Sequence, residues 1–208
     1  MHIPFGPYEK YFKRPLDLFC GLLAVVVFCW LYLLLIILGV IFMRGNPFFC
    51  QERPGKNEKT FKLIKFRTMD NRKDKMGNYL PDKVRLNRYG RFLRKTSLDE
   101  IPEAFNIIKG DMSVIGPRPL LKQYLPLYSE EQHHRHDVRP GLSGYAQVNG
   151  RNSIKWTHRF ELDCEYVNHI TFLGDMKILL QTIGKAFFKQ EGISSVTSDT
   201  MEDFNGSN

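Results

Sequence analysis

The residues with the clearest chemical potential form one short stretch in the middle of the chain, Arg94-Lys95-Thr96-Ser97-Leu98-Asp99-Glu100. Two adjacent carboxylates beside two cations can bind a divalent metal ion while the arginine faces a phosphate chain. An ionised aspartate can also attack phosphorus and form an aspartyl phosphate. Ser97 and Glu100 match a capping box, and Pro102 fits only a first helical turn, so we expect a helix to begin between Ser97 and Asp99. The alternative is that both acids merely cap this helix, whose positive end keeps them ionised.

Other reactive side chains give weaker patterns. Arg118 lies between two prolines, which restrict the backbone and can fix a guanidinium fork towards a diphosphate, and Arg151 follows Asn149-Gly150 in a similar setting. The chain has no G-x-x-x-x-G-K-[ST] sequence and no strand–G-x-G-x-x-G–helix unit, so the common nucleotide-binding loops are absent. No acid or cysteine completes a metal-ligand spacing with the clustered histidines. We therefore expect exposed positions on a helix for His133, His134 and His136.

An uncharged run from Leu18 to Met43 places these residues near a membrane. Its 26 positions would make a helix about 39 Å long, against about 30 Å of hydrocarbon in a bilayer. The run is longer than a signal peptide's apolar region, and Arg44-Gly45-Asn46-Pro47 after it is a helix stop rather than a cleavage site. Basic residues flank both ends, which favours a re-entrant helix with both ends on one face over a simple span. The interior contains no proline to bend such a helix, only Gly21, Gly39 and the Cys29-Trp30 region.

A strongly basic block follows the apolar run. Arg53–Lys95 contains 15 lysine and arginine residues against four acids. Directly after a membrane segment, such a block predicts attraction to anionic lipid, worth about 1 kcal/mol per residue near the surface. A nucleic-acid patch, a cradle for phosphate-bearing substrates and a plain solvated face remain alternatives.

The remainder predicts a small, mostly helical α+β domain with a β-hairpin. The chain has 208 residues, 43% of them hydrophobic and 25% charged, which excludes disordered and collagen-like classes. Its four cysteines show no paired spacing, which favours a reducing compartment. We divide the chain into a lead and membrane-immersed helix (1–44), a compact domain (45–190) and a mobile C-terminal tail (191–208).

Pattern and turn signals give the elements of that domain. Phe48–Glu52 and Thr60–Met69 are expected strands, joined by the turn Arg53-Pro54-Gly55-Lys56. Helical spacing from Leu98 to Ile108 predicts a helix that Gly110 ends. A short strand is expected at Ser113–Ile115 and a strand or loop at Gly144–Arg151. Further helices are expected at Val84–Phe92, Gln123–His136, Trp156–His169 and Asp175–Lys189.

The order of several motifs resembles the bacterial sugar transferases, and more narrowly the small monotopic phosphoglycosyl transferases of the PglC type. The resemblance runs from about Tyr8 to about Lys189. It rests on Lys13-Arg14 before the apolar run, Lys65-Phe66-Arg67-Thr68-Met69, Arg94 through Glu100, Lys109-Gly110-Asp111-Met112-Ser113, Gly116-Pro117-Arg118-Pro119-Leu120, Arg139-Pro140-Gly141 and Ala146-Gln147-Val148-Asn149-Gly150-Arg151-Asn152.

The resemblance implies a specific reaction. Such enzymes transfer a sugar 1-phosphate from a UDP-sugar to polyprenyl (undecaprenyl) phosphate at the bacterial inner membrane and release UMP. By that likeness, residues 45–190 form a cytoplasmic catalytic domain. Asp99 is the nucleophile and a Mg²⁺ ligand, and Glu100 organises the pair. Lys65, Arg94, Arg118 and Arg151 are the candidates for phosphate or nucleotide contacts. The implied partners are the two substrates, inner-membrane lipids and downstream glycosyltransferases, with no nucleic acid, and the sugar is expected to be N-acetylated or amino-deoxy.

One departure from the family pattern concerns topology. Members usually carry a Ser-Pro pair midway along the apolar run, and here Cys29-Trp30 stands in that place. Charge on both flanks still favours re-entry. Two other functions remain open on the sequence: a membrane-tethered module that binds anionic lipid or nucleic acid without catalysis, and a phosphohydrolase that acts on lipid diphosphates with the same acids.

Overall fold

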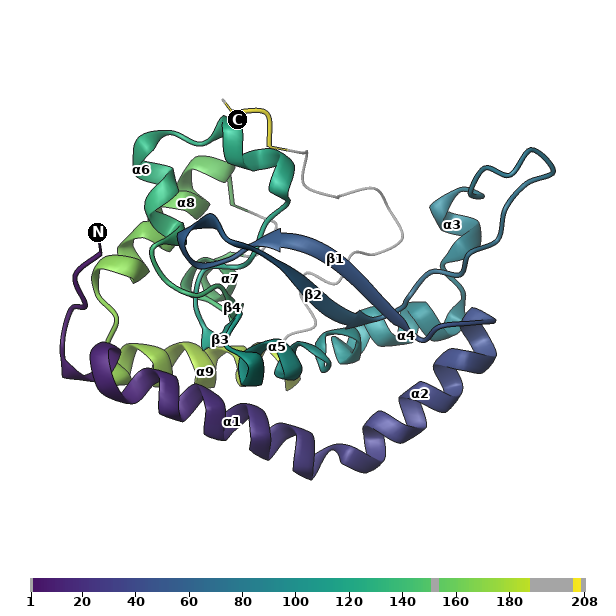
Figure 1. Ribbon diagram of the computed structural model, residues 1–208, viewed down its shortest axis with the longest axis horizontal. Coiled ribbons are helices and arrows are strands. Elements are labelled where there is room, and N and C mark those ends of the chain that lie inside the picture. Colours follow the sequence, from purple (N-terminus) through teal and green to yellow (C-terminus); the bar gives the residue numbers. More distant parts are fainter. Residues whose placement is uncertain (1, 151–153, 188–203, 207–208) are drawn as a thin grey trace.

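The computed structural model describes residues 2–150, 154–187 and 204–206. A mostly helical α+β domain lies above a bent pair of N-terminal helices (Figure 1). The α-helices are α1 (Lys13–Val27), α2 (Cys29–Met43), α3 (Asp82–Arg85), α4 (Arg88–Thr96), α5 (Glu103–Lys109), α6 (Glu130–His133), α7 (Tyr145–Asn149), α8 (Trp156–Asn168) and α9 (Phe172–Phe187). The strands are β1 (Phe48–Pro54), β2 (Thr60–Phe66), β3 (Ser113–Ile115) and β4 (Gly141–Ser143). The predicted α+β class is confirmed.

The uncharged run folds as two helices rather than one. A π-helical turn (Tyr8–Phe12) leads into α1, and the chain then bends by 65° before α2, so that the two helices form an open V in Figure 1. The bend lies at Phe28, whose ψ of 13° departs from helical geometry although no proline is present. Large apolar side chains on both arms face outward, including Phe19 (61% exposed) and Trp30 (62%). Within the described residues, no single helix is long and apolar enough to cross a membrane, whereas this bent pair passes by length and composition.

Polar contacts fasten the helix pair to the domain above it. The Asp17 carboxylate accepts hydrogen bonds from the Ser113 hydroxyl at 2.7 Å and from the Val114 N–H at 2.9 Å. The Arg14 guanidinium donates to two carbonyls at the end of α5. From α2, the Tyr32 hydroxyl donates to the Ile101 carbonyl at 2.6 Å. Because Ile101 directly follows the acid pair, the apolar V supports the turn that carries it.

The predicted hairpin is confirmed. Strands β1 and β2 pair antiparallel from Phe48 opposite Phe66 to Pro54 opposite Thr60. The predicted turn is displaced, because Arg53 and Pro54 still pair in β1 and the chain reverses through a 3₁₀ turn at Lys56–Glu58; β2 also ends at Phe66 rather than at Met69. Strand β3 lies where it was expected and pairs in parallel with β4. The strand or loop expected at Gly144–Arg151 is instead the short helix α7, and the strand of that region is β4, just before it.

Two helix predictions were wrong in their boundaries. The helix expected at Val84–Phe92 is two helices, because the Asn87 side chain accepts a hydrogen bond from the Gly90 N–H at 2.9 Å and caps α4. The segment Gln123–His136 contains only α6 and two 3₁₀ stretches. In contrast, α5 ends at Gly110 as predicted, with the glycine at a left-handed φ of 98°.

An aromatic cluster forms part of the core beside α8. Phe204, which falls in the expected mobile tail, is only 4% exposed because its ring packs 5.0 to 5.8 Å from four others. These rings belong to Tyr124, Tyr128, Trp156 and Phe160. The other tail residues apart from Asn205 and Gly206 lie outside the described residues.

Candidate active site

The acid pair occupies a 3₁₀ turn, Leu98–Glu100, between α4 and α5. Ser97 closes α4 with a left-handed φ of 55°, and its side chain makes no capping hydrogen bond. The expected capping box is therefore wrong: α5 begins only at Glu103, after Pro102 as its N-cap residue. The turn leaves the Glu100 side chain available for contacts with other parts of the fold.

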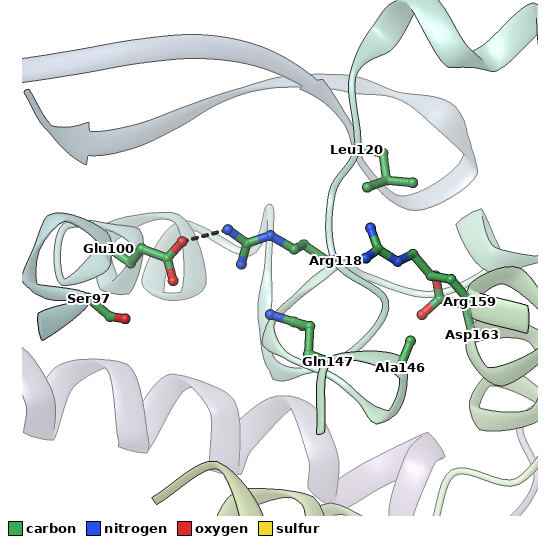
Figure 2. A pocket seen from close by; sticks show the side chains of 8 residues that line it. All are labelled: Ser97, Glu100, Arg118, Leu120, Ala146, Gln147, Arg159 and Asp163. Atoms are coloured by element: carbon green, nitrogen blue, oxygen red, sulfur yellow. Dashed lines mark hydrogen bonds and ion pairs between the residues drawn. The ribbon is translucent and has the colours of Figure 1, made fainter. Parts of the chain in front are cut away.

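Two cations meet at one oxygen of Glu100. The Lys65 ammonium, from β2, lies 2.7 Å from Oε1. The Arg118 guanidinium, from the loop after β3, lies 2.6 Å from the same oxygen, the contact drawn in Figure 2. Burial alone would raise the pKa of Glu100, but Arg118 and Lys65 outweigh it and lower that pKa to about 2. Glu100 is therefore ionised at neutral pH.

Unlike Glu100, Asp99 has no lysine or arginine in contact with its carboxylate among the described residues. Within the described part of the chain, no hydrogen bond or ion pair from another residue holds its half-buried carboxylate. Burial, followed by the charge of Glu100, raises the pKa of Asp99 to about 6. Asp99 is therefore still mostly ionised at pH 7, as the sequence analysis expected. An ionised carboxylate without a fixed partner can attack phosphorus or bind a cation.

Glu103, which the sequence analysis missed, is a third carboxylate in this cluster. It lies at the start of α5, is 2% exposed, and places Oε1 3.1 Å from the Lys65 ammonium. Burial raises its pKa to about 7, and the charge of Glu100 acts in the same direction against the opposing effect of Lys65. Its position three residues after Glu100 was the available signal, because residues three apart share a helical face.

Arg94 and Arg151 are the other two residues predicted to contact phosphate or nucleotide. Arg94 is exposed and donates from Nε to the Thr68 hydroxyl at 3.0 Å. It makes no ion pair with the acids, although its charge lowers the pKa of Asp99 somewhat against the effect of burial. Arg151 lies outside the described residues. The structure therefore brings Lys65 and Arg118 together at Glu100 and leaves Arg94 beside the cluster.

A cleft of about 250 Å³ extends from Glu100 to α8. Figure 2 shows Glu100 and the Arg118 guanidinium at one side, and Arg159 with Asp163 at the other. The Arg159 guanidinium stacks 4.7 Å from the Trp156 ring centre. The remaining lining residues are Ser97, Leu120, Ala146 and Gln147. A cleft with guanidinium groups at both sides suits a ligand with more than one phosphate oxygen.

Among the described residues, no three histidine, cysteine or acidic side chains gather as a metal site. Mg²⁺ commonly uses only one or two protein carboxylates together with substrate phosphates, so the Asp99 carboxylate fits such an ion. The histidine cluster does not compete for this role: His133 contacts Glu58, and His134 contacts Asp137. His136 is 5% exposed, so the expectation of an exposed residue is wrong there. Burial and then the charge of Arg135 lower its pKa to about 3.

Comparisons with known proteins find a family model and several relatives that match most of this chain. The family model described as bacterial sugar transferase matches residues 8–189. An uncharacterized sugar transferase, EpsL, of Bacillus subtilis is 47% identical over 94% of this chain and 96% of its own length.

Two relatives with more specific names are longer proteins. The undecaprenyl-phosphate galactose phosphotransferase of Salmonella typhimurium is 31% identical over 88% of this chain and 42% of its own length. The UDP-N-acetylgalactosamine-undecaprenyl-phosphate N-acetylgalactosaminephosphotransferase of Aeromonas hydrophila is 32% identical over 86% of this chain and 44% of its own length. The chain thus spans less than half of these two relatives.

Proposed function

The chain belongs to the bacterial sugar transferase family, and from that premise we propose that it is a phosphoglycosyl transferase. It transfers a sugar 1-phosphate from a UDP-sugar to polyprenyl phosphate and releases UMP. The observation that carries the proposal is the contrast within the acid pair: Glu100 is held by Lys65 and Arg118, whereas the Asp99 carboxylate has no fixed partner in the described residues. The names of the Salmonella and Aeromonas relatives support the lipid acceptor.

The first half-reaction forms a covalent intermediate on Asp99. A carboxylate oxygen attacks the phosphorus next to the sugar, the bond from that phosphorus to the bridging oxygen breaks, and UMP departs with the electron pair. In the second half-reaction, an oxygen of polyprenyl phosphate attacks the same phosphorus. The Asp99 carboxylate is released, and a polyprenyl-diphosphate-linked sugar is formed. Because the phosphosugar is held covalently between the two half-reactions, one site can use a soluble donor and a membrane-bound acceptor in turn.

The cations around the pair stabilise charge as the phosphates react. Lys65 and Arg118 hold Glu100 ionised and face the phosphates, and Arg94 and Arg151 are proposed to add contacts to the phosphate or nucleotide. Asp99 is the proposed protein ligand for Mg²⁺, which supplies neutralisation of the diphosphate charge when bound. Glu100 keeps the cations oriented, because both already contact its Oε1.

The bent helix pair gives the proposed membrane topology. We assign it as a re-entrant element that leaves the catalytic domain on the cytoplasmic face of the inner membrane. The 65° bend, the outward apolar side chains and the basic residues at both ends support this assignment. A label that cannot cross membranes should fail to react with a cysteine in an N-terminal tag of intact cells. Reaction with that cysteine would contradict re-entry.

The sugar is proposed to be N-acetylated or amino-deoxy. The names of the Salmonella and Aeromonas relatives include galactose and N-acetylgalactosamine, so the panel of UDP-sugar donors must contain both kinds.

UMP release in the presence and absence of undecaprenyl phosphate tests the reaction. We expect release with one UDP-sugar, multiple turnovers only when the acceptor is present, and none with Asp99→Asn. A binding module without catalysis gives no UMP, and a phosphohydrolase releases phosphate from a lipid diphosphate without a UDP-sugar. Either result would contradict the proposal.

A further inference from the structure

The Lys65 ammonium lies between two carboxylates of unequal exposure. It is 2.7 Å from Glu100 Oε1 and 3.1 Å from Glu103 Oε1. The Glu100 side chain is 21% exposed and lines the cleft, whereas the Glu103 side chain is 3% exposed. One contact of the ammonium therefore faces the substrate side, and the other lies in the protein interior.

The interior contact is the more constrained of the two. Glu103 follows Pro102 at the start of a helix, where the backbone is fixed on both sides, and a buried carboxylate is costly unless a donor satisfies it. Lys65 is its one ion-pair partner among the described residues. Arg118, Glu100 and, from β1, Arg53 are the other charged groups whose fields reach Glu103.

We propose that Glu103 is a positioning residue for phosphoryl transfer, which holds the Lys65 ammonium at the edge of the cleft. Its carboxylate is too deeply buried to meet a substrate, so it acts through Lys65. When a phosphate draws the ammonium away from Glu100, the contact with Glu103 keeps the flexible lysine side chain in place. A lysine on a four-carbon stem otherwise loses considerable rotamer freedom when it binds a phosphate.

The kinetic effect of this positioning role rests on the proposed function. Substitutions at Glu103 test the role. We expect Glu103→Leu to lower kcat/KM for the UDP-sugar by roughly ten- to a hundredfold. Glu103→Asp should show a similar loss, because the shorter side chain withdraws the carboxylate from Lys65 while retaining its charge. Glu103→Gln should stay within about threefold of wild type, since its amide oxygen still accepts from the ammonium.

A double-mutant cycle separates positioning from general structural support. In a Lys65→Met background, Glu103→Leu should lower kcat/KM by less than about twofold further, because the group through which it acts is gone. A loss of the same size in both backgrounds would overturn the proposal. Wild-type kinetics in both Glu103→Leu and Glu103→Asp would also overturn it.

A measurement independent of turnover keeps this inference separate from the proposed function. Amine-reactive labelling followed by mass spectrometry reports the reactivity of each lysine in the full-length, folded protein. We expect Lys65 to react severalfold faster in Glu103→Asp than in wild type or Glu103→Gln, with Lys122, an exposed lysine that pairs with Glu52, unchanged as control. Equal Lys65 labelling in all three proteins would overturn the positioning role even if UMP release proceeds. Faster Lys65 labelling in a protein that never releases UMP would support the positioning and contradict the proposed function.

Discussion

Replacing Arg118 by methionine tests whether this residue keeps Glu100 ionised. The lowering of the Glu100 pKa from 4.5 to about 2 corresponds to roughly 3 kcal/mol between the charged and neutral carboxyl. Lys65 shares this effect, and the Arg118 side chain is 39% exposed, so solvent screens its part. We therefore expect Arg118→Met to lower the free energy of unfolding by about 1–2 kcal/mol at pH 7.

The pH dependence of that loss follows from the direction of the shift. A carboxyl whose pKa is lowered on folding stabilises the protein fully above its unfolded pKa, here near 4.5, and loses that contribution as pH falls through about 2. The part of the difference between wild type and Arg118→Met that Glu100 carries should thus shrink below pH 4.5. Between pH 7 and 5 the difference also changes, because Glu103 and Asp99 titrate there in the field of Arg118. Thermal unfolding in lipid nanodiscs across this range measures it.

Activity and controls complete the experiment. We expect Arg118→Met to reduce kcat for UMP release by about a hundredfold, since a charged donor to the reacting phosphate is lost, and Arg118→Lys to recover only part of it. Lys122→Met removes an exposed cation that pairs with Glu52 at 3.4 Å, and should change neither quantity measurably. Wild-type activity together with a stability difference that persists unchanged below pH 4.5 would refute the reasoning for Arg118.

Three further predictions concern stability, the tail and the metal. The pKa of His136 is lowered from 6.5 to about 3, so the free energy of unfolding of wild type should fall by about 1.5–2 kcal/mol between pH 6.5 and 5, as the unfolded state takes up a proton. Thermal unfolding of His136→Asn should lack this loss. Equal dependence on pH in the two proteins would contradict the prediction. Phe204→Ala should lower the free energy of unfolding by about 3 kcal/mol, because it opens a cavity in the aromatic cluster. It should also raise KM for the UDP-sugar, because the cluster includes the Trp156 ring that stacks on Arg159. Unchanged stability and KM would show that the tail contact is dispensable. Removal of divalent metal by a chelator should abolish UMP release reversibly. The melting temperature should not fall, since one carboxylate and the substrate phosphates are proposed to hold the ion. Undiminished turnover would contradict the magnesium assignment.

Local chemistry was sufficient to predict much of the scaffold. A Pro-Gly turn between aromatic strands predicts the hairpin, and Gly110 predicts the end of α5, because these features depend on the backbone preferences of adjacent residues. The apolar run was recognisable by its length and composition. Charge on both flanks predicted a re-entrant and therefore bent helix, with the Cys29-Trp30 region among three possible places for the break. The residue types did not select that place, since Phe28 interrupts the helix without the proline or glycine that usually marks a break.

The site depends on contacts that short-range patterns do not encode. Ser97 and Glu100 have the residue types of a capping box, but Ser97 adopts a left-handed conformation and Glu100 pairs with cations from distant segments. An acid at the start of a helix is normally exposed, so the spacing of Glu103 from Glu100 did not by itself predict that Glu103 is buried. Arg159 reaches the cleft from a helix about 60 positions after the acid pair, and only the tertiary arrangement places it there.

The most direct test of the reaction is the mass of the enzyme after exposure to donor alone. With the correct UDP-sugar, Mg²⁺ and no polyprenyl phosphate, intact-protein and peptide mass spectrometry should detect one added phosphosugar on Asp99. The adduct should vanish when polyprenyl phosphate is supplied, and Asp99→Asn should never acquire it. Turnover with no adduct on Asp99 at any time, or an adduct on another side chain, would contradict the covalent route.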